Sequence, residues 1–414
     1  MADTELHKRF LLALSMTFLL ACLSAAAFNY LVDPYGLFGS RRVAGFNELK
    51  PAAAERVRVA KPYMASRVKP RSVIGGNSRP EMGLNPRSAC WEDGEQSVFN
   101  TAIPGADVFM QVRYVQHAAE SGETRRIFFG VDFLDFLVDP SKSTGHIDWN
   151  RLDRNSRLMS RAETGFIPIG GQQAADVFSG LFSLGAVEDS FLTVASQRNI
   201  HSPTRHENGF NPAQDYLQII RGEGQSVLFM QKNAELRKRL HRMNLGIVDV
   251  NGQPSKHILA LRRMLDWAET EGTEVVLFIN PYHADYLVQI EESGNWRLLE
   301  EWKRQLAGVA SEYGVALWDF NTFDRYSTEP PPARNDKLSI LHWFWEPAHY
   351  RQELGDVMLA NMLARPCVAD LHPPFGVRVT PTSLESHLNG LRSDLHRFIQ
   401  EHPNTVYRLG ARAP

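Results

Sequence analysis

The chain has 414 residues, of which 43% are hydrophobic and 22% charged, so disorder is excluded for most of it and a large core is expected. Its formal net charge is -2 and its charge runs are short and mixed in sign, which excludes a nucleic-acid binder that works through a basic surface. The three cysteines, Cys22, Cys90 and Cys367, form neither a CxxC pair nor a Cys/His cluster, so we expect no zinc cluster and no thioredoxin-type site.

The N-terminal segment is almost unbroken in its apolar character over residues 10–32, and Lys8 and Arg9 precede it. About 20 such residues cross a bilayer core. The basic pair favours an N-in orientation, which predicts an anchor over residues 1–32 in a bacterial inner membrane, with the main domain in the periplasm. Two alternatives, a cleaved signal peptide and a lipoprotein signal ending before Cys22, also export the domain. A buried globular helix is the remaining alternative.

The next segment, residues 33–70, is rich in Pro, Ala and Arg and is predicted to be a membrane-proximal connector. Short buried strands are then expected at residues 71–78, 97–105, 126–133, 274–280 and 315–320. Helical spacing of apolar residues occurs at 107–120, 258–268 and 298–306. This alternation predicts an α/β domain over residues 71–366, a three-layer sandwich whose central parallel sheet has about five strands and helices on both faces.

Two stretches depart from the alternation. Residues 137–255 carry several helical patterns and polar loops, and we interpret them as an insertion that covers the site. Residues 367–414 form a connector and a final amphipathic helix near residues 384–399. In an exported domain, Cys90 and Cys367 either form a disulfide or stay as two buried thiols, and the sequence leaves both open.

Chemically interesting residues follow the predicted strands. Open parallel sheets carry their functional loops at the carboxyl ends of the strands. Four polar or glycine positions lie at such ends, namely Ser78, Asn100, Gly105 and Asp132. Asp132 is expected to accept hydrogen bonds from backbone donors behind the serine loop. We therefore look for the site at this edge of the sheet.

A serine is a weak nucleophile until a base takes its proton, and a carboxylate fixes the tautomer of that base. Ser78 follows the first strand, and His349 lies in the segment WFWEPAHYR with Glu346 three residues ahead of it. The sequence therefore predicts Ser78 as nucleophile, His349 as general base and Glu346 as its orienting carboxylate. The backbone N–H groups of Ser78 and Gly105 are candidate donors to the oxyanion.

At these residues the chain resembles the SGNH (GDSL-type) hydrolase superfamily. Its first block matches Gly76-Asn77-Ser78-Arg79, with Asn77 where GDSL enzymes have Asp. Its second block is similar to Asn100-Thr-Ala-Ile-Pro-Gly105, and its C-terminal DxxH pair to Glu346-Pro-Ala-His349. The resemblance covers residues 71–363 without the insertion. It implies a flavodoxin-like sandwich and a serine esterase or acyltransferase. The segment NYLVDPYG at residues 29–36 also looks like the anchor of exported SGNH-like proteins that modify cell-surface polymers.

Two departures from the family pattern bear on activity. The third block has Gly130-Val131-Asp132 where the family has an Asn that donates to the oxyanion, and valine cannot donate. Loss of one such donor costs roughly 100 to 1,000-fold in rate, so a replacement is needed, for which Asn100 and Asn280 are candidates. Glu346 occupies the position where the family has Asp, and because its side chain is longer, its loop must lie farther from His349.

Two further residues are candidate substrate contacts, and each has a structural alternative. Arg79 is placed to contact an anionic or sugar substrate, or to form a salt bridge. His283, after the fourth strand, is placed to line the pocket or to serve the fold. Structural roles also remain open for the triad: Ser78 as a turn cap, His349 as a core residue and Glu346 as a helix-start device.

The resemblance implies two classes of function. The first is an esterase or O-acyltransferase that acts on an ester of a cell-envelope carbohydrate through an acyl-enzyme. The second is a catalytically degenerate domain that binds glycan or scaffolds an envelope complex. The sequence contains no P-loop, no full dinucleotide fingerprint and no clustered ligands, so we expect no cofactor and no metal, and no nucleic-acid partner. It leaves the oligomeric state open.

Overall fold

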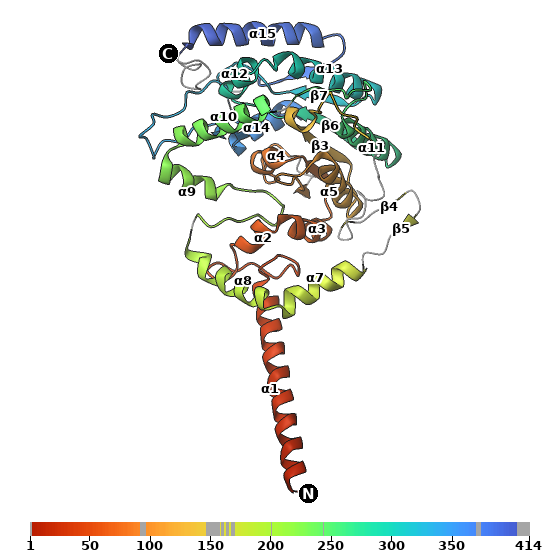
Figure 1. Cartoon of the computed structure of the whole chain (residues 1–414), viewed down its shortest axis with the longest axis vertical. Helices are drawn as coiled ribbons and strands as arrows, with labels where there is room; N and C mark the ends of the chain where they lie inside the picture. The colour runs from red at the N-terminus through yellow and green to blue at the C-terminus, as the bar shows by residue number, and fades with distance from the viewer. Residues whose placement is uncertain are drawn as a thin grey trace.

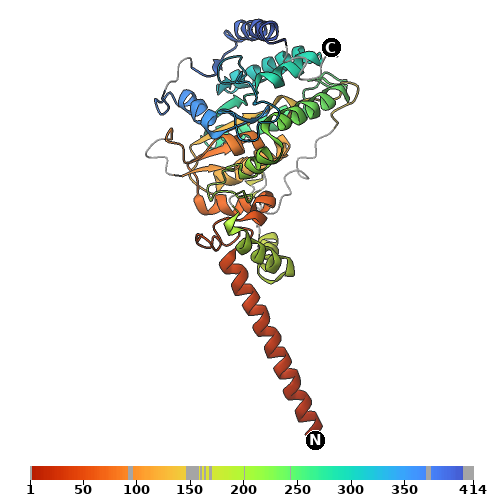
Figure 2. The same cartoon turned by 90° about the vertical axis from the view of Figure 1, so that its left-hand side faces the viewer.

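The structure is a computed structural model that describes residues 2–91, 97–145, 158, 161–162, 165–166, 170–199, 201–242, 244–369 and 374–403. A domain of helices and strands stands on one long N-terminal helix, α1 (Ala2–Val32) (Figure 1). The view turned by 90° shows α1 leaving the domain as a single rod (Figure 2). Among the described residues it is the one continuous helix that is long and apolar enough to cross a membrane, with a mean hydropathy of 2.2.

The centre of the domain is a six-stranded sheet with the order β10-β7-β6-β3-β1-β2. Its strands are β1 (Ser72–Gly75), β2 (Val98–Asn100), β3 (Arg126–Val131), β6 (Glu274–Ile279), β7 (Ala316–Asp319) and β10 (Val377–Val379). The first five pair in parallel, and β10 pairs antiparallel to β7. The five parallel strands are those expected from the sequence. Their spatial order is that of the doubly wound 2-1-3-4-5 sheets, which bind ligands where the strand order reverses, here between β1 and β3.

Alternate residues of the strands enter two separate clusters of buried residues, as the two-residue period of a strand requires. Val73 of β1 lies in a cluster with Leu261 of α11 (Lys256–Thr270), whereas its neighbour Ile74 lies in a cluster with Leu354 of α14 (Gln352–Met362). Both faces of the sheet are therefore buried, which explains why these strands are continuous apolar runs in the sequence.

The helices of the α/β part are α4 (Ser78–Gly83), α5 (Val108–Glu120), α11 (Lys256–Thr270), α12 (Ala284–Glu292), α13 (Trp296–Glu312), α14 (Gln352–Met362) and α15 (Leu384–Glu401), with a short 3-10 turn η1 (Phe133–Asp135). The helical spacing at 107–120, 258–268, 298–306 and 384–399 is confirmed by α5, α11, α13 and α15. Asp107 caps α5 by accepting a hydrogen bond from the Met110 N–H. Polar caps and an apolar face therefore both define this helix.

The segment predicted as a connector, residues 33–70, contains α2 (Pro51–Glu55) and α3 (Val57–Val68). Ala60, Met64 and Ala65 of α3 are buried in the same cluster as Val73 of β1. This segment therefore contributes to the core of the domain.

The predicted insertion, residues 137–255, contains α7 (Gly170–Phe182), α8 (Leu184–Ala195), α9 (Gln214–Glu223) and α10 (Gln225–Arg242), a 3-10 turn η2 (Ser196–Arg198) and the two-residue strands β4 (Arg161–Ala162) and β5 (Gly165–Phe166). Parts of it, such as residues 146–157, lie outside the described residues. The Asn208 carbonyl accepts a hydrogen bond of 2.8 Å from the Asn100 N–H. The insertion therefore lines the open edge of β2.

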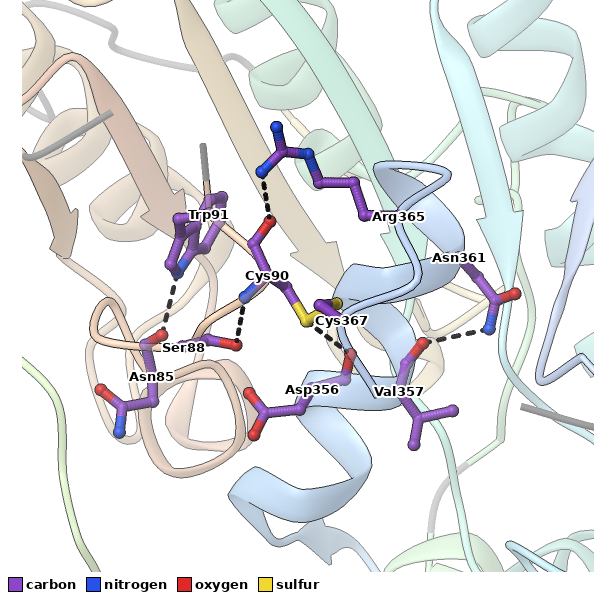
Figure 3. Close-up of a disulfide and its surroundings, with 9 residues drawn as sticks. All are labelled: Asn85, Ser88, Cys90, Trp91, Asp356, Val357, Asn361, Arg365 and Cys367. Carbon is purple, nitrogen blue, oxygen red and sulfur yellow. Dashed lines mark hydrogen bonds between the residues drawn. A yellow bond between two sulfur atoms is a disulfide. The ribbon is translucent and has the colours of Figure 1, made fainter. Parts of the chain in front are cut away.

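The structure joins Cys90 and Cys367 in a disulfide with a Cα–Cα distance of 5.0 Å, so of the two alternatives left by the sequence the bonded one is present (Figure 3). Cys90 lies in the loop after α4, and its carbonyl accepts a hydrogen bond from Arg365. Cys367 follows α14, whose Asp356 carbonyl lies 3.4 Å from the Cys90 sulfur. The bond therefore links the chain after α4 to the chain after α14.

Candidate active site

Ser78 is positioned by a turn between β1 and α4. Gly76 adopts a φ of +134°, and a side chain there would come within 2.9 Å of the Gly130 carbonyl oxygen, so the turn requires glycine. Asn77 then caps α4 by accepting a hydrogen bond of 3.1 Å from the Arg79 N–H. Ser78 is the first residue of the helix, and the backbone N–H at that position makes no bond within its own helix.

Glu346 and His349 belong to a tight hairpin rather than to a loose loop. Strand β8 (Phe344–Glu346) pairs with β9 (His349–Tyr350), and Glu346 lies opposite His349. Pro347 and Ala348 form the turn, which suits proline because its φ is fixed. Glu346 ends a strand, so it is not a helix-start device. The hairpin is held to the sheet through the His283 N–H, which donates to the Pro347 carbonyl at 2.9 Å.

The three side chains form one hydrogen-bonded chain. The Ser78 Oγ lies 2.6 Å from the His349 Nε2. The other ring nitrogen, Nδ1, bonds the Glu346 Oε1, and the Glu346 Oε2 accepts from the Ala348 N–H at 2.9 Å. The Glu346 side chain is fully buried, whereas 16% of the His349 side chain is exposed. Ser78 and His349 are 271 positions apart in sequence, so only the fold brings them together.

No model of a known family, no curated protein and no solved structure matches this chain. What the site can do is therefore argued from its own residues.

The electrostatics of Glu346 favour its ionised form. Burial opposes the charge most strongly, but His349 beside it and the hydrogen bonds from His349 and the Ala348 N–H outweigh burial and lower the pKa of Glu346 below its ordinary value. A carboxylate in this state fixes Nδ1–H as the donor and leaves Nε2 to accept the serine proton. The arrangement can therefore deprotonate Ser78.

Arg79 forms a salt bridge in the structure, which is one of the two roles that the sequence left open for it. Its guanidinium pairs with Asp132 at the end of β3, its Nε donates to the Ala348 carbonyl at 2.8 Å, and only 10% of its side chain is exposed. Burial acts against the charge, but the pKa of Arg79 is raised because Asp132 is so close. Arg79 therefore ties the serine helix to β3 and to the turn beside His349.

Asn100 does not serve as an oxyanion donor, which corrects one prediction. Its side chain is fully buried, and its amide nitrogen donates to the Pro80 carbonyl at 2.7 Å and the Leu84 carbonyl at 2.9 Å. A side-chain amide nitrogen carries two hydrogens, and these two hydrogen bonds use both of them. Asn100 instead holds the end of α4 against β2.

Gly105 lies on the loop that follows β2, and this loop is bonded to the serine turn. The Thr101 N–H donates to the Ile74 carbonyl at 2.9 Å and the Ile103 N–H donates to the Gly76 carbonyl at 3.0 Å. Gly105 itself is exposed, with a φ of +61° and open space where a side chain would be. Its role as an oxyanion donor stays a prediction.

The His283 side chain is bonded within the fold, which fits the structural one of the two roles that the sequence left open for it. The ring is buried and caps α12: Nδ1 accepts from the Asp285 N–H at 3.1 Å, and Nε2 lies 2.8 Å from the Glu329 carbonyl oxygen. Both ring nitrogens are used, which leaves neither for a ligand.

The segment Gly130-Val131-Asp132, which corresponds to the third block of the family pattern, lies at the end of β3 and supplies no side-chain donor near Ser78. Val131 is buried in the core, and the Asp132 carboxylate accepts from the Tyr282 hydroxyl at 2.8 Å and the Leu134 N–H at 3.3 Å. Asn280, the other candidate, donates to the Val131 carbonyl at 3.0 Å and accepts from the Tyr350 hydroxyl. In the described part of the chain, no group of three or more His, Cys, Asp or Glu side chains is arranged to hold a metal ion.

Two features of the site were not anticipated. Tyr216 of α9 lies with its ring centre 6.2 Å from that of His349, so the insertion reaches the histidine. Buried Glu81 of α4 bonds Lys61 of α3 at 3.1 Å and Arg205 of the insertion at 2.8 Å. Burial raises the pKa of Glu81 most, but these two cations hold it below its usual range. The pattern Ser-x-x-Glu at 78–81 is typical of a helix capping box, which gives no sign of such long-range partners.

Proposed function

We propose that this protein is a membrane-anchored serine esterase or O-acyltransferase of the SGNH kind, built as a three-layer sandwich. The observation that carries the proposal is the continuous chain from the Ser78 hydroxyl through the His349 ring to the buried Glu346 carboxylate. A structural serine at a turn has no need of a histidine whose far nitrogen is held by a buried carboxylate. This arrangement costs desolvation of a charge, and nucleophile activation is the use that explains it.

In the proposed reaction, the Ser78 oxygen attacks an ester carbonyl while His349 Nε2 takes the serine proton. Glu346 stabilises the resulting imidazolium and keeps Nε2 directed at the serine. His349 then returns the proton to the leaving alcohol, which leaves an acyl group on Ser78. Water or a sugar hydroxyl attacks this ester with His349 again as base. The N–H groups of Ser78 and Gly105 are the proposed oxyanion donors.

The proposed substrate is an ester of a cell-envelope carbohydrate, and the proposed location of the domain is the periplasmic side of a bacterial inner membrane. The basic pair Lys8 and Arg9, which precedes the apolar run within α1, supports this orientation. The Cys90–Cys367 disulfide supports it independently, because such bonds persist in oxidising compartments. The substrate class follows from the family resemblance alone.

A second candidate is a domain of the same fold that binds glycan without turnover. Two observations favour it: Val131 replaces the donor of the third block, and the amide of Asn100 is fully engaged elsewhere. Such a protein would keep the geometry of Ser78, His349 and Glu346 but would have too few oxyanion donors for turnover.

The test is covalent labelling of the full chain, in detergent or nanodiscs, with a fluorophosphonate, followed by hydrolysis of a short-chain nitrophenyl ester. We expect labelling that Ser78→Ala abolishes and that Glu346→Gln slows roughly 1,000-fold or more, because a neutral amide no longer fixes the histidine tautomer. Ser311→Ala, at an exposed serine of α13, is the matched control and should label as the parent does.

A parent chain that fails to label, or labelling that survives Ser78→Ala, would overturn the catalytic proposal and favour the binding domain. If labelling succeeds, transfer of the acyl group to sugar acceptors in competition with water distinguishes a transferase from an esterase.

A further inference from the structure

Helices α7 and α8 both contact α1 and lie on either side of its upper end in Figure 1, where α1 enters the domain. Asn29, three residues before the end of α1, is buried and bonds both helices. Its amide donates to the Leu181 carbonyl of α7 at 2.9 Å and accepts from the Ser190 hydroxyl of α8 at 2.8 Å. The rings of Phe28 and Phe191 lie 4.9 Å apart. The two helices are therefore fixed level with the last turns of α1.

Two acidic residues, Asp176 of α7 and Asp189 of α8, face the domain. Asp176 of α7 accepts a hydrogen bond of 2.7 Å from the Tyr63 hydroxyl of α3. Asp189 of α8 accepts from the Tyr35 hydroxyl at 2.6 Å and pairs with Arg56 at 3.2 Å. These contacts orient each helix about its own axis and leave its opposite side turned away from the domain.

That opposite side is apolar and open. It carries large hydrophobic side chains that are exposed by 39% to 87% of their area, namely Val177, Phe178, Phe182, Leu184, Phe191 and Leu192. A single apolar side chain on a surface needs no explanation, but six large apolar side chains exposed on two neighbouring helices mark an interaction site.

The height of the patch matches a membrane boundary. Taking Phe10 as the first apolar residue after the basic pair, about 20 residues at 1.5 Å each span the roughly 30 Å hydrocarbon core, and the twentieth is Asn29. Asn29 is the residue that bonds α7 and α8. Tyr30, next to it, is exposed, as aromatic residues at membrane boundaries are.

We propose that α7 and α8 form a membrane-docking surface that lies in the boundary of the bilayer, on the side where the domain stands, with their apolar side chains inserted between lipids. Neither helix crosses: α7 has 13 residues and α8 has 12, so each is only about 20 Å long or less, and the pair is bent by 62°. Together with α1 they hold the domain at a fixed height and tilt over the membrane.

The charge pattern indicates what drives this contact. Residues 170–195 contain no lysine or arginine, and Glu188 is exposed on α8 near Phe191. Interfacial helices that bind on their own commonly carry basic residues that attract anionic lipid. Here α1 brings the surface to the bilayer, so docking depends on apolar insertion and is insensitive to salt and to the anionic lipid content. Glu188 limits the depth to the head-group boundary.

The test places a nitroxide label on single cysteines of the full chain and measures its collisions with oxygen, which concentrates in the bilayer, and with a water-soluble nickel complex. The protein is reconstituted in vesicles of phosphatidylcholine with or without phosphatidylglycerol. In a Cys22→Ser background, Phe178→Cys, Leu184→Cys and Leu192→Cys report the surface. Arg397→Cys, on the exposed face of α15 at the far end of the domain, is the aqueous control, and native Cys22 of the parent is the control inside the bilayer.

We expect the oxygen-to-nickel collision ratio at positions 178, 184 and 192 to exceed that at 397 at least fivefold, to stay below that at Cys22, and to change little between 0.05 and 0.5 M salt. Ratios equal to the one at 397 would overturn the proposal, because the patch would then face water. Ratios equal to the one at Cys22 would also overturn it, because the pair would then enter the bilayer core. The exposed positions chosen make few contacts, and Leu184, at 87% exposure, is the site whose replacement disturbs packing least.

Discussion

Replacing Arg79 with Met tests whether this residue serves the fold of the site or a substrate. The substitution keeps the length of the aliphatic stem and removes the guanidinium. In the structure that group pairs with Asp132 and donates to the Ala348 carbonyl, in surroundings where a tenth of the side chain is exposed. Loss of the guanidinium leaves the Asp132 carboxylate buried without its counter-charge.

The magnitude follows from these two contacts. Removal of one partner of a buried ion pair costs about 3 to 5 kcal/mol, and loss of a charge-assisted hydrogen bond about 1.5 to 3 kcal/mol. The two terms share one side chain and do not add in full, so we expect Arg79→Met to lower the free energy of unfolding by about 4 kcal/mol. The labelling rate of Ser78 should fall as well, because the Ala348 carbonyl adjoins His349.

The assay is urea denaturation of the full chain in detergent, followed by tryptophan fluorescence. Arg297→Met in α13 is the matched control: it removes an arginine that is 88% exposed and pairs with Glu301 at 2.8 Å, and such pairs contribute under about 1 kcal/mol. If Arg79→Met and Arg297→Met have free energies of unfolding within 1 kcal/mol of each other, our assignment of Arg79 to the fold is refuted and a substrate contact becomes the better explanation.

Two further predictions concern the surroundings of the serine. Burial, and then the neighbouring Asp132, raise the pKa of Asp135 to about 6, so its carboxyl stabilises the fold below about pH 4 and loses that contribution as the pH rises through 6. Asp135→Asn should therefore stabilise the protein by up to about 3 kcal/mol above pH 6 and should have no such effect at pH 4. The measurement is the difference in thermal midpoint between the variant and the parent at each pH, and an equal difference at the two pH values would contradict this prediction. In α14, a side chain at Gly355 would come within 1.8 Å of the Gly83 carbonyl oxygen, whereas one at Gly308 in α13 meets nothing within 4 Å. Gly355→Ala should lower the free energy of unfolding by at least about 2 kcal/mol, and Gly308→Ala should raise it by about 0.5 to 1 kcal/mol. Urea midpoints of the two variants that shift in the same direction would contradict the close packing of α4 on α14.

The parallel strands and the triad could be predicted because their signals are local. A buried parallel strand is a continuous apolar run, and Ser78, Glu346 and His349 each sit in a short motif. Strand β10 was missed because it has three residues, two of them exposed, and it forms only by pairing with the edge of β7. Val377 of β10 pairs with Asp319 of β7, which lies 58 positions earlier in the chain, and a local sequence pattern does not reveal such a distant partner.

Side-chain roles that depend on distant partners could not be predicted. Arg79 and His283 carry groups that suit a ligand as well as the fold, and the choice depends on Asp132 for the first and on the Glu329 carbonyl for the second. The same holds for Asn100, whose amide suits an oxyanion until Pro80 and Leu84 are seen beside it. Residue type limits what a side chain can do, but its neighbours decide what it does.

The bond between Cys90 and Cys367 also has a consequence for the order in which the molecule matures. It encloses a loop whose ends are 277 positions apart, so it cannot close until 367 of the 414 residues have been synthesised. Helix α4, which carries Ser78, is synthesised early, and the hairpin that carries His349 is synthesised late. The disulfide therefore links the segments that follow these two elements only near the end of synthesis. A chain interrupted between residues 349 and 367 therefore contains both Ser78 and His349 but lacks the covalent bond that links their two segments.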